Sequence, residues 1–276
     1  MALPHFFAAG PFEGAPGETA RPLLEEAALR HMRTLRLRPG EHVVIGDRPG
    51  HGWEMELLSV PGHRRDALEG TLVGEHADAP ETGLTLVQGI SAAERMDQTL
   101  RQTTELGVSR VIPLESERSN VRLDAAARRA KQRRWQRIAQ SAAEQSGRLR
   151  MPEIGHPVGL GDALALLEGH DALFLFWEEP GGTTFGEAWE RAAAAHREAS
   201  LHGTSQGGGP GSLGAPVPRT ALFVGPEGGF SASEARRMQG AGAYTVSLGS
   251  NILRTETAAV VACTLALSRL GALGGR

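Results

Sequence analysis

From residue 84 to the carboxyl end, short apolar runs alternate with longer segments whose apolar residues recur at helical spacing. The apolar runs occupy residues 84–88, 110–113, 172–177, 221–224 and 244–248, and the helical pattern occupies 95–106, 125–145, 184–196, 232–240 and 256–270. Strands that alternate with helices are typical of a parallel sheet covered on both faces. The pattern predicts an α/β domain, and because knotted folds are rare, periodicity alone favours a simple doubly wound sheet.

The first 74 residues show a β-rich pattern instead. Residues 42–47 form a short apolar run between two turn signals, and residues 53–57 alternate apolar with acidic side chains, so the two predict a hairpin. Before them, residues 25–36 predict a short helix with basic residues spread around it, among them Arg30 and Arg36. A chain of 276 residues is long enough for two unequal domains, which we place at 1–74 and 75–276.

Residues 199–220 interrupt the α/β pattern. This segment is rich in glycine and proline and has too little apolar surface to offset the entropy of ordering it. We therefore expect a flexible surface insertion here. A lid over a site is the alternative, because long loops sometimes serve that purpose.

Charge is distributed unevenly along the chain. The net charge of −3 argues against a uniformly basic surface for nucleic acid. Residues 118–150, however, hold ten Arg and Lys against two acids, Asp124 and Glu144, a local net charge of ten minus two, or +8. Such a segment predicts a phosphate-facing surface, with a solvated helix face as the alternative. The candidate phosphate contacts in it are Arg118, Arg122, Arg134, Arg137 and Arg148.

Several kinds of site and location are disfavoured by composition. Cys263 is the sole cysteine, which excludes an intramolecular disulfide or a cysteine-rich zinc site, and its apolar neighbours predict a small packed side chain. The ten histidines show no paired metal-binding spacing, so we expect no metal. No signal-peptide pattern and no apolar run of about 18 residues is present, and we expect a soluble, cytoplasmic protein.

Two glycine-containing turns are the most informative feature of the chain. Each of the segments 221–231 and 247–258 reads as a buried strand that enters such a turn and then a helix, which leaves backbone N–H groups free at the turn. The Gly-Pro-Glu-Gly-Gly sequence at 225–229 is neither a P-loop nor a dinucleotide fingerprint, and alone it would be read as an ordinary turn. Together, the two turns predict a pocket.

These two turns also carry a family resemblance. Gly-Pro-Glu-Gly-Gly at 225–229 with Ser-Leu-Gly-Ser-Asn-Ile-Leu-Arg-Thr-Glu-Thr-Ala at 247–258 resembles the RsmE family of SPOUT-class methyltransferases. Two further blocks fit in the same order, one from Gln88 to Ser119 and one from Arg134 to Pro152. The resemblance covers roughly residues 84–270, and the first 75 residues match more loosely.

The resemblance implies a specific architecture and activity. Members of this family methylate N3 of a uridine in small-subunit ribosomal RNA and use S-adenosylmethionine. It implies a SPOUT-type parallel sheet with a carboxy-terminal trefoil knot, an amino-terminal PUA-like β-barrel that helps hold RNA, and a homodimer in which Glu144 and Gln145 belong to the seam. The expected partner is small-subunit ribosomal RNA or the assembling 30S subunit, and Arg30 and Arg36 join the candidate RNA contacts.

By the same resemblance, the two turns bind the cofactor. The backbone around Leu248, Ile252 and Leu253 would hold the adenine, and Gly225, Glu227 and Gly228 would lie near the ribose and methionine. Glycines allow a close approach of backbone to ligand. Leu175 or Phe176, at the end of the preceding strand, should line the same pocket. The full set of expected cofactor-binding residues is Leu175, Phe176, Val224, Gly225, Pro226, Glu227, Gly228, Leu248, Gly249, Ile252, Leu253 and Ala258.

Arg254 and Glu227 are the candidate catalytic residues. We expect Arg254 in apolar surroundings, where an unpaired charge is costly, so that a substrate phosphate or a uracil carbonyl satisfies it. An ion pair with Glu256 or Glu227, or a bridge across a dimer, is the alternative. Uridine N3 carries a proton at neutral pH, and Arg254 would stabilise the developing uracilate by its charge. Glu227 is the nearby carboxylate that can accept the proton, and the alternative is that it binds the ribose.

Two other functions compete with this one. Another SPOUT methyltransferase, acting on transfer RNA or on a ribose 2′-OH, would share much of the site. A non-catalytic RNA-binding assembly factor would keep the fold but would have lost turnover. The intact glycines of both turns and the presence of Arg254 argue against the second.

Overall fold

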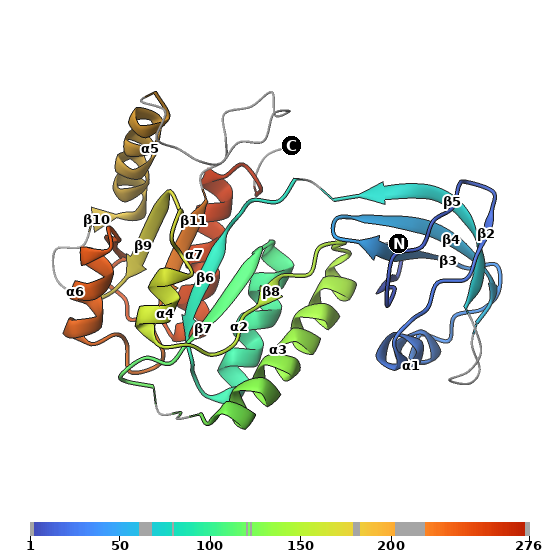
Figure 1. The fold of residues 1–276 in the computed structure, drawn as a ribbon, viewed down its shortest axis with the longest axis horizontal. Helices are drawn as coiled ribbons and strands as arrows, with labels where there is room; N and C mark the ends of the chain where they lie inside the picture. The colour runs from blue at the N-terminus through green and yellow to red at the C-terminus, as the bar shows by residue number, and fades with distance from the viewer. Residues whose placement is uncertain are drawn as a thin grey trace. The chain divides into compact units, whose positions relative to one another are not determined.

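A computed structural model describes residues 3–60, 68–78, 80–119, 121, 123–178, 183–201 and 219–273, with the backbone alone at 200 and 201. The chain forms two compact units (Figure 1). The first takes in the described residues up to Pro80 together with Gln140–Met151, and the second takes in Glu81–Ala139 and the residues from Pro152 onward. A boundary at residue 74 would cut strand β5 (Glu69–Ala77), so the structural boundary lies beyond the end of that strand.

The first unit contains a five-stranded sheet in the order β1-β3-β4-β5-β2. Its other elements are β1 (His5–Phe7), β2 (Thr19–Ala20), α1 (Glu26–Thr34), β3 (His42–Arg48) and β4 (His51–Ser59). Strands β3 and β4 pair antiparallel, with Arg48 opposite His51, which confirms the predicted hairpin. Met32 of helix α1 and Phe6, Ile45 and Met55 of the sheet are fully buried in the core of this unit.

The second unit is built on a seven-stranded sheet in the order β10-β12-β9-β11-β6-β7-β8. Every neighbouring pair in it is parallel. The strands are β6 (Thr85–Gly89), β7 (Arg110–Leu114), β8 (Glu153–Ile154), β9 (Ala172–Phe176), β10 (Thr183–Thr184), β11 (Thr220–Val224) and β12 (Tyr244–Ser247). The predicted α/β domain with a parallel sheet is confirmed. Strands β8 and β10 were not predicted, because two residues are too few to show a period.

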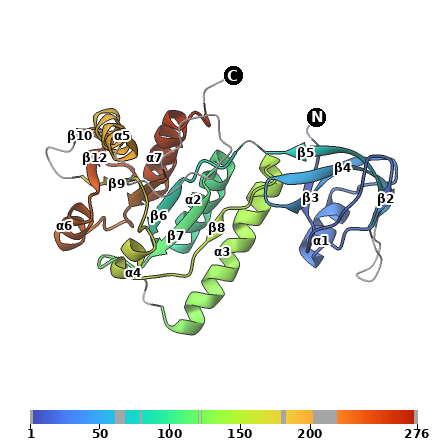
Figure 2. The ribbon, with the colours of Figure 1, turned by 45° about the horizontal axis from the view of Figure 1, so that its top comes forward.

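Helices cover both faces of this sheet (Figure 2). They are α2 (Ala93–Leu106), α3 (Ala125–Ser146), α4 (Leu160–Ala165), α5 (Phe185–Leu201), α6 (Ala232–Gly240) and α7 (Thr255–Arg269). Buried side chains of α2, α3, α5 and α7 pack in one core, and those of α4 and α6 pack in a second core. The sheet therefore separates two apolar layers, as a doubly covered parallel sheet requires.

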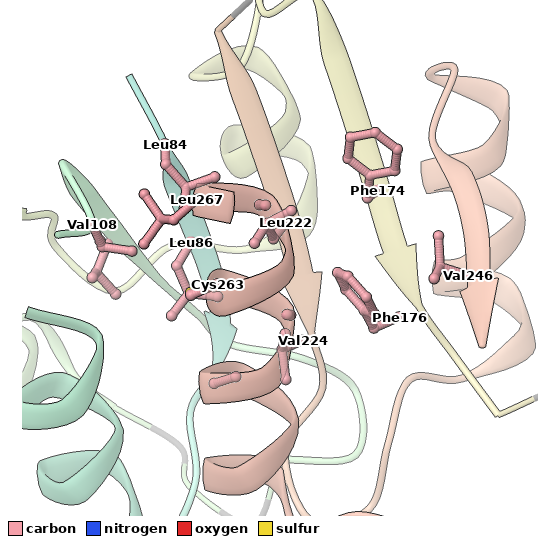
Figure 3. Close-up of a cluster of buried hydrophobic side chains, with 14 of the residues drawn as sticks. Leu84, Leu86, Val108, Phe174, Phe176, Leu222, Val224, Val246, Cys263 and Leu267 are labelled. Carbon is pink, nitrogen blue, oxygen red and sulfur yellow. The ribbon is translucent and has the colours of Figure 1, made fainter. Parts of the chain in front are cut away.

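Alternation along the strands sends neighbouring residues into different cores. Leu222 and Val224 of β11 face α7, where Cys263 and Leu267 are buried (Figure 3). Phe223, between them, belongs to the core on the other face. Burial raises the pKa of the Cys263 thiol to about 12, so the thiol stays protonated and unreactive at ordinary pH.

The strand order brings the loops after β11 and β12 to the same edge of the sheet, on either side of β9. Strand β11 lies between β9 and β6, and β12 lies on the other side of β9. Because these strands are parallel, the loops that follow β11 and β12 leave the same, carboxyl edge, which is where open α/β sheets bind ligands. The flexible insertion predicted at 199–220 is wrong at its ends, because residues 199–201 belong to α5 and Thr220 begins β11. Residues 202–218 lie outside the described part of the chain, and there the insertion stays a prediction.

Candidate functional site

A pocket of 710 Å³ opens at the carboxyl edge of the second unit's sheet. The ends of β9, β11 and β12 form it, and two arginines from other segments, Arg95 and Arg118, complete its lining. Of the residues predicted to bind a cofactor, the structure brings together Phe176, Val224, Gly225, Pro226, Glu227, Gly228, Leu248, Gly249, Ile252, Leu253 and Ala258. The candidate catalytic residue Arg254 lies in the same lining, as do Trp177, Glu178 and Thr255, which sequence reasoning missed.

Leu175 is the exception among these residues. It is fully buried in the core on the face of the sheet opposite α7, with Val87 and Phe223. Its neighbour Phe176 packs in the core on the α7 side and also lines the pocket. Successive residues of a strand point to opposite faces, so only one of the two could reach the pocket. The structure selects Phe176.

The glycines of the two turns are needed for the conformation and close packing of the chain itself. A Cβ on Gly228 would lie 3.0 Å from the carbonyl oxygen of Arg118, and one on Gly225 would lie 3.1 Å from Gly229. Gly229 and Gly249 have φ of +66° and +105°, a region that disfavours other residues. Sequence reasoning assigned these glycines to close approach of a ligand. In the structure, Gly225 and Gly228 first allow close approach of other parts of the chain.

A buried glutamine joins three segments beneath the pocket. Gln88, at the end of β6, donates through Nε2 to Thr255 Oγ1 at 2.9 Å, to the Gly89 carbonyl at 3.0 Å and to the Gly225 carbonyl at 3.4 Å. Thr255 Oγ1 in turn donates to the Gly225 carbonyl at 2.5 Å. The glutamine therefore connects β6 to the turn after β11 and to the first residue of α7. A polar residue in an otherwise apolar run was the sequence signal for it.

Glu227 connects its turn to the start of helix α2. Its Oε1 accepts a hydrogen bond from the backbone N–H of Ala92, the residue before that helix, at 2.9 Å. The same oxygen lies 3.2 Å from Arg95 Nη1. A carboxylate at this place stabilises a helix N-terminus. Glu227 thus has a structural role in addition to its place on the pocket wall.

Arg118 is held at the pocket by the loop at 115–119. The backbone N–H of Glu117 donates to Glu234 Oε1 at 2.9 Å, and its carboxylate accepts a hydrogen bond from the Ser233 hydroxyl at 2.8 Å. Hydrogen bonds from the hydroxyls of Ser231 and Ser233 lower the pKa of Glu117, so that it stays ionised at neutral pH. Arg118 donates to the carbonyl of Gly228 at 3.4 Å. The loop is therefore fixed to the amino end of α6 on one side and to the glycine turn on the other.

Arg254 differs from its predicted environment. The side chain is exposed at the start of α7, and the apolar enclosure expected for it is wrong. No ion pair of Arg254 forms among the residues that the structure describes, and Glu227 pairs with Arg95 instead. Glu256 is buried at the same helix end, and its Oε2 has no hydrogen-bond partner in the described chain. The cation is thus available to a group that arrives from solvent.

The predicted RNA contacts divide into different environments. Arg134 forms an ion pair with Asp97, and Arg30 lies 3.8 Å from Glu26 on the same helix. Arg36 is exposed with φ of 57°, Arg148 is half-buried, and Arg122 lies outside the described residues. Arg118 lines the pocket.

Glu144, expected at a dimer seam, is buried. It lies in the first unit, with Oε2 at 3.7 Å from His31 Nδ1, and burial raises its pKa. Gln145 is exposed. No group of three or more His, Cys, Asp and Glu that could hold a metal ion occurs within the described ranges. Nor does any helix there have the length and apolar character needed to cross a membrane.

Replacing Gly89 tests how closely β6 meets the glycine turn. In Gly89→Ala, the new Cβ would lie 2.4 Å from Pro226 Cδ and 2.5 Å from Pro226 N, so the two segments must separate. We expect the free energy of unfolding to fall by about 1–3 kcal/mol, as overpacking usually costs. Urea denaturation measures it.

The matched control is Gly240→Ala. The added Cβ meets nothing within 4 Å at the end of α6, where alanine favours the helix, so stability should be unchanged or slightly higher. Equal stability of the Gly89 and Gly240 variants would contradict the close contact between β6 and the turn.

Comparison with known proteins shows the family to which the chain belongs. The model of the RNA methyltransferase domain matches residues 78–267, which is more than half of the chain. The ribosomal RNA small subunit methyltransferase E of Bacillus subtilis is 27% identical over 232 residues, which cover 84% of this chain and 83% of the relative. That of Mycobacterium tuberculosis is 29% identical over 252 residues, which cover 88% and 82%.

A solved structure agrees with these sequence relatives. The ribosomal RNA small subunit methyltransferase E of Neisseria gonorrhoeae, crystallised with S-adenosyl methionine bound, aligns with a TM-score of 0.75 and 29% identity over 97% of this chain and 98% of its own. The resemblance to the RsmE family is thereby confirmed. The chain belongs to the family of proteins that carry the RNA methyltransferase domain.

Proposed function

We propose that the protein transfers a methyl group from S-adenosylmethionine to N3 of a uridine in small-subunit ribosomal RNA. The observation that carries this proposal is the pocket itself, in which the glycine turns after β11 and β12 meet at the carboxyl edge of the sheet, although β9 lies between the two strands. The names of the relatives support ribosomal RNA as the substrate. Work in the cytoplasm on free RNA or on the assembling 30S subunit follows from that substrate.

The described residues fit S-adenosylmethionine. The pocket volume of 710 Å³ lies within the range that suits ligands of this size. None of the five backbone N–H groups from Ser250 to Arg254 donates to another described residue, so they are free to hold the polar edge of an adenine. Phe176, Leu248 and Leu253 supply apolar walls for the ring. When bound, the cofactor supplies an electrophilic methyl group on a sulfonium.

Arg254 and Glu227 act on the substrate side in this proposal. Arg254 is exposed at the pocket and lacks a carboxylate partner among the described residues, so a uracil carbonyl can meet its guanidinium there. Its charge stabilises the negative charge that develops on the base as N3 loses its proton. Glu227 Oε1 is already occupied by Ala92 and Arg95, which leaves Oε2 to accept that proton or to bind the ribose.

A methylation assay with purified protein tests the proposal. With unmodified small-subunit ribosomal RNA and S-adenosylmethionine, nucleoside analysis by mass spectrometry should show 3-methyluridine. Arg254→Ala should lower turnover about 100-fold, the usual cost of removing one group that stabilises developing charge. The affinity for S-adenosylmethionine, measured by calorimetry, should change little, because the side chain points to solvent rather than into the core.

Other products of the assay would indicate a different substrate or function. Methylated ribose, or methylation of transfer RNA alone, would show a different SPOUT-type substrate, and cofactor binding without any product would indicate an assembly factor. Glu227→Gln keeps the shape of the side chain but removes its charge. At an unchanged melting temperature, which shows that the contacts with Ala92 and Arg95 are not needed for the fold, loss of turnover alone assigns proton acceptance to Glu227 and loss of affinity assigns ribose binding.

The finer architecture is also proposed from the resemblance. We infer a trefoil knot formed by the segment from β11 to α7, supported by the position of β11 between β6 and β9. We infer a PUA-like barrel in the first unit, which is supported by the five-stranded sheet and by a bridge between Ala8 and Leu24 outside its strands. Tracing of the backbone in an experimental density map tests both.

A homodimer is supported by the outer face of α7. Leu265 of this helix and Ile252 just before it are exposed apolar side chains, 37% and 84% accessible, and Val260 and Val261 are only half-buried. An apolar face of this kind favours contact with a partner, and a second copy is the occupant that the resemblance implies.

Sedimentation equilibrium tests the dimer. We expect twice the chain mass of 29.3 kDa for the wild type and a shift toward one chain mass for Leu265→Asp, because a charge on that face is costly to bury. The control is Leu166→Asp, which places a charge at an exposed leucine just after α4 and away from that face. A wild-type protein that sediments as a single chain at micromolar concentration would rule the dimer out.

A further inference from the structure

The arginines of helix α3 fall into two groups. Arg128 donates to both carboxylate oxygens of Glu115, at 2.8 Å and 2.6 Å, and Arg134 pairs with Asp97. Arg129, Arg133 and Arg137 are exposed instead, and none of them forms an ion pair with another described residue. The first group holds α3 to the rest of the second unit. The second group has no such structural role.

The three exposed arginines lie on one face of the helix. They are spaced four residues apart, which places them in a row about 12 Å long from first to last. Trp135, which lies between the second and third arginine in sequence, is buried in the core, and so is Ala139, which follows the third. The first turn of α3 contains no acid, and Glu144 near its end is buried beside His31. Asp124, just before α3, accepts a hydrogen bond from the backbone N–H of Ala127. Among the described residues, no carboxylate forms an ion pair with any of the three arginines.

This arrangement is unfavourable for the isolated protein. Like charges at i and i+4 on a helix destabilise it by about 0.2–0.5 kcal/mol per pair, and this row contains two such pairs. Elsewhere on α3 the fold supplies carboxylates to arginines, at Glu115 and Asp97. A row left without them, in a chain with a net charge of −3, indicates an anionic partner that repeats along a line.

The row lies on a helix that is tied by an ion pair to α2, the helix that carries the pocket residue Arg95. Asp97, the partner of Arg134, lies on α2, two residues after the pocket residue Arg95. In sequence, the loop that carries Arg118 at the pocket leads directly into α3. The helix that bears the row is thus fixed to the helix that forms part of the pocket wall.

We propose that Arg129, Arg133 and Arg137 form a docking row for the sugar–phosphate backbone of the substrate RNA next to the methylated base. This inference rests on the proposed function for the identity of the RNA. Arginine matches phosphate by its planar, two-pronged set of donors, and a row of three meets successive phosphates rather than a single one. The row supplies affinity and orientation, and the pocket selects the base.

The salt dependence of RNA binding tests the row. The probe is a fluorescently labelled transcript of small-subunit ribosomal RNA, and its affinity for the full chain is measured by anisotropy between 50 and about 200 mM salt. The variant Arg129→Gln, Arg133→Gln, Arg137→Gln removes three phosphate contacts. The slope of log affinity against log salt should become shallower by about 2–3, which is the value expected for three phosphate contacts on a single or a double strand.

A charge-matched control variant separates the row from net charge. Arg191→Gln, Arg197→Gln, Arg236→Gln also removes three exposed arginines, from α5 and α6, and should leave the slope unchanged. An unchanged slope in the α3 variant, an equal change in the control, or no binding by the wild type would each overturn the proposal. All six sites are exposed, so the melting temperature of the control should stay close to that of the wild type, and that of the α3 variant should be equal or slightly higher, because two like-charge pairs are removed.

Failure of the proposed function would look different. If the enzyme modifies another nucleotide, the salt dependence of RNA binding still becomes shallower in the α3 variant, although no 3-methyluridine forms. If only the row is wrong, 3-methyluridine forms and the slope does not change. The two outcomes are read from separate measurements on the same proteins.

Discussion

The hydrogen bonds of one buried amide underlie the whole site. Gln88 Nε2 contacts Thr255 Oγ1 and the Gly225 carbonyl, which belong to segments more than 130 residues away in sequence. Buried polar groups are costly unless they are paired, so these contacts favour one arrangement of β6, the turn after β11 and the start of α7. The lack of a Cβ at Gly89 permits the same close approach. The pocket exists because these three segments are held together.

Because of this constraint, the residues around the pocket fall into two groups, one that holds the turns and one that is exposed to the substrate. Residues that hold the turns are buried and hydrogen-bonded, as Gln88 is through Nε2 and Thr255 through Oγ1, or anchored at a helix end, as Glu227 is. The residues that we propose to meet RNA, Arg254 and the row on α3, are exposed and lack carboxylate partners in the described chain. A rigid interior with free cations at its rim suits an enzyme that encloses a small cofactor and accepts a large polyanion from solvent.

The sequence predicted the fold of the second unit well, because long apolar runs and helical periods are local signals. It also predicted most of the pocket, since the two glycine turns are recognisable without a structure. The sequence left Leu175 and Phe176 as alternatives for the pocket wall, because a fully apolar strand does not show which side faces the ligand, and the structure has Phe176 there. The prediction of apolar surroundings for Arg254 was wrong, and the burial of Glu144 was not predicted, for a related reason. Both depend on packing between distant elements, and the basic segment likewise gave no sign of which arginines are paired within the fold.

The central claim is that Gln88 and Thr255 act together to hold the pocket. A double-mutant cycle with Gln88→Leu and Thr255→Val, with S-adenosylmethionine affinity measured by calorimetry, tests it most directly. We expect each single variant to weaken binding, and the double variant to be little worse than either, with a coupling of about 0.5–3 kcal/mol. Losses that add to within about 0.3–0.5 kcal/mol would show independent residues and would contradict this account.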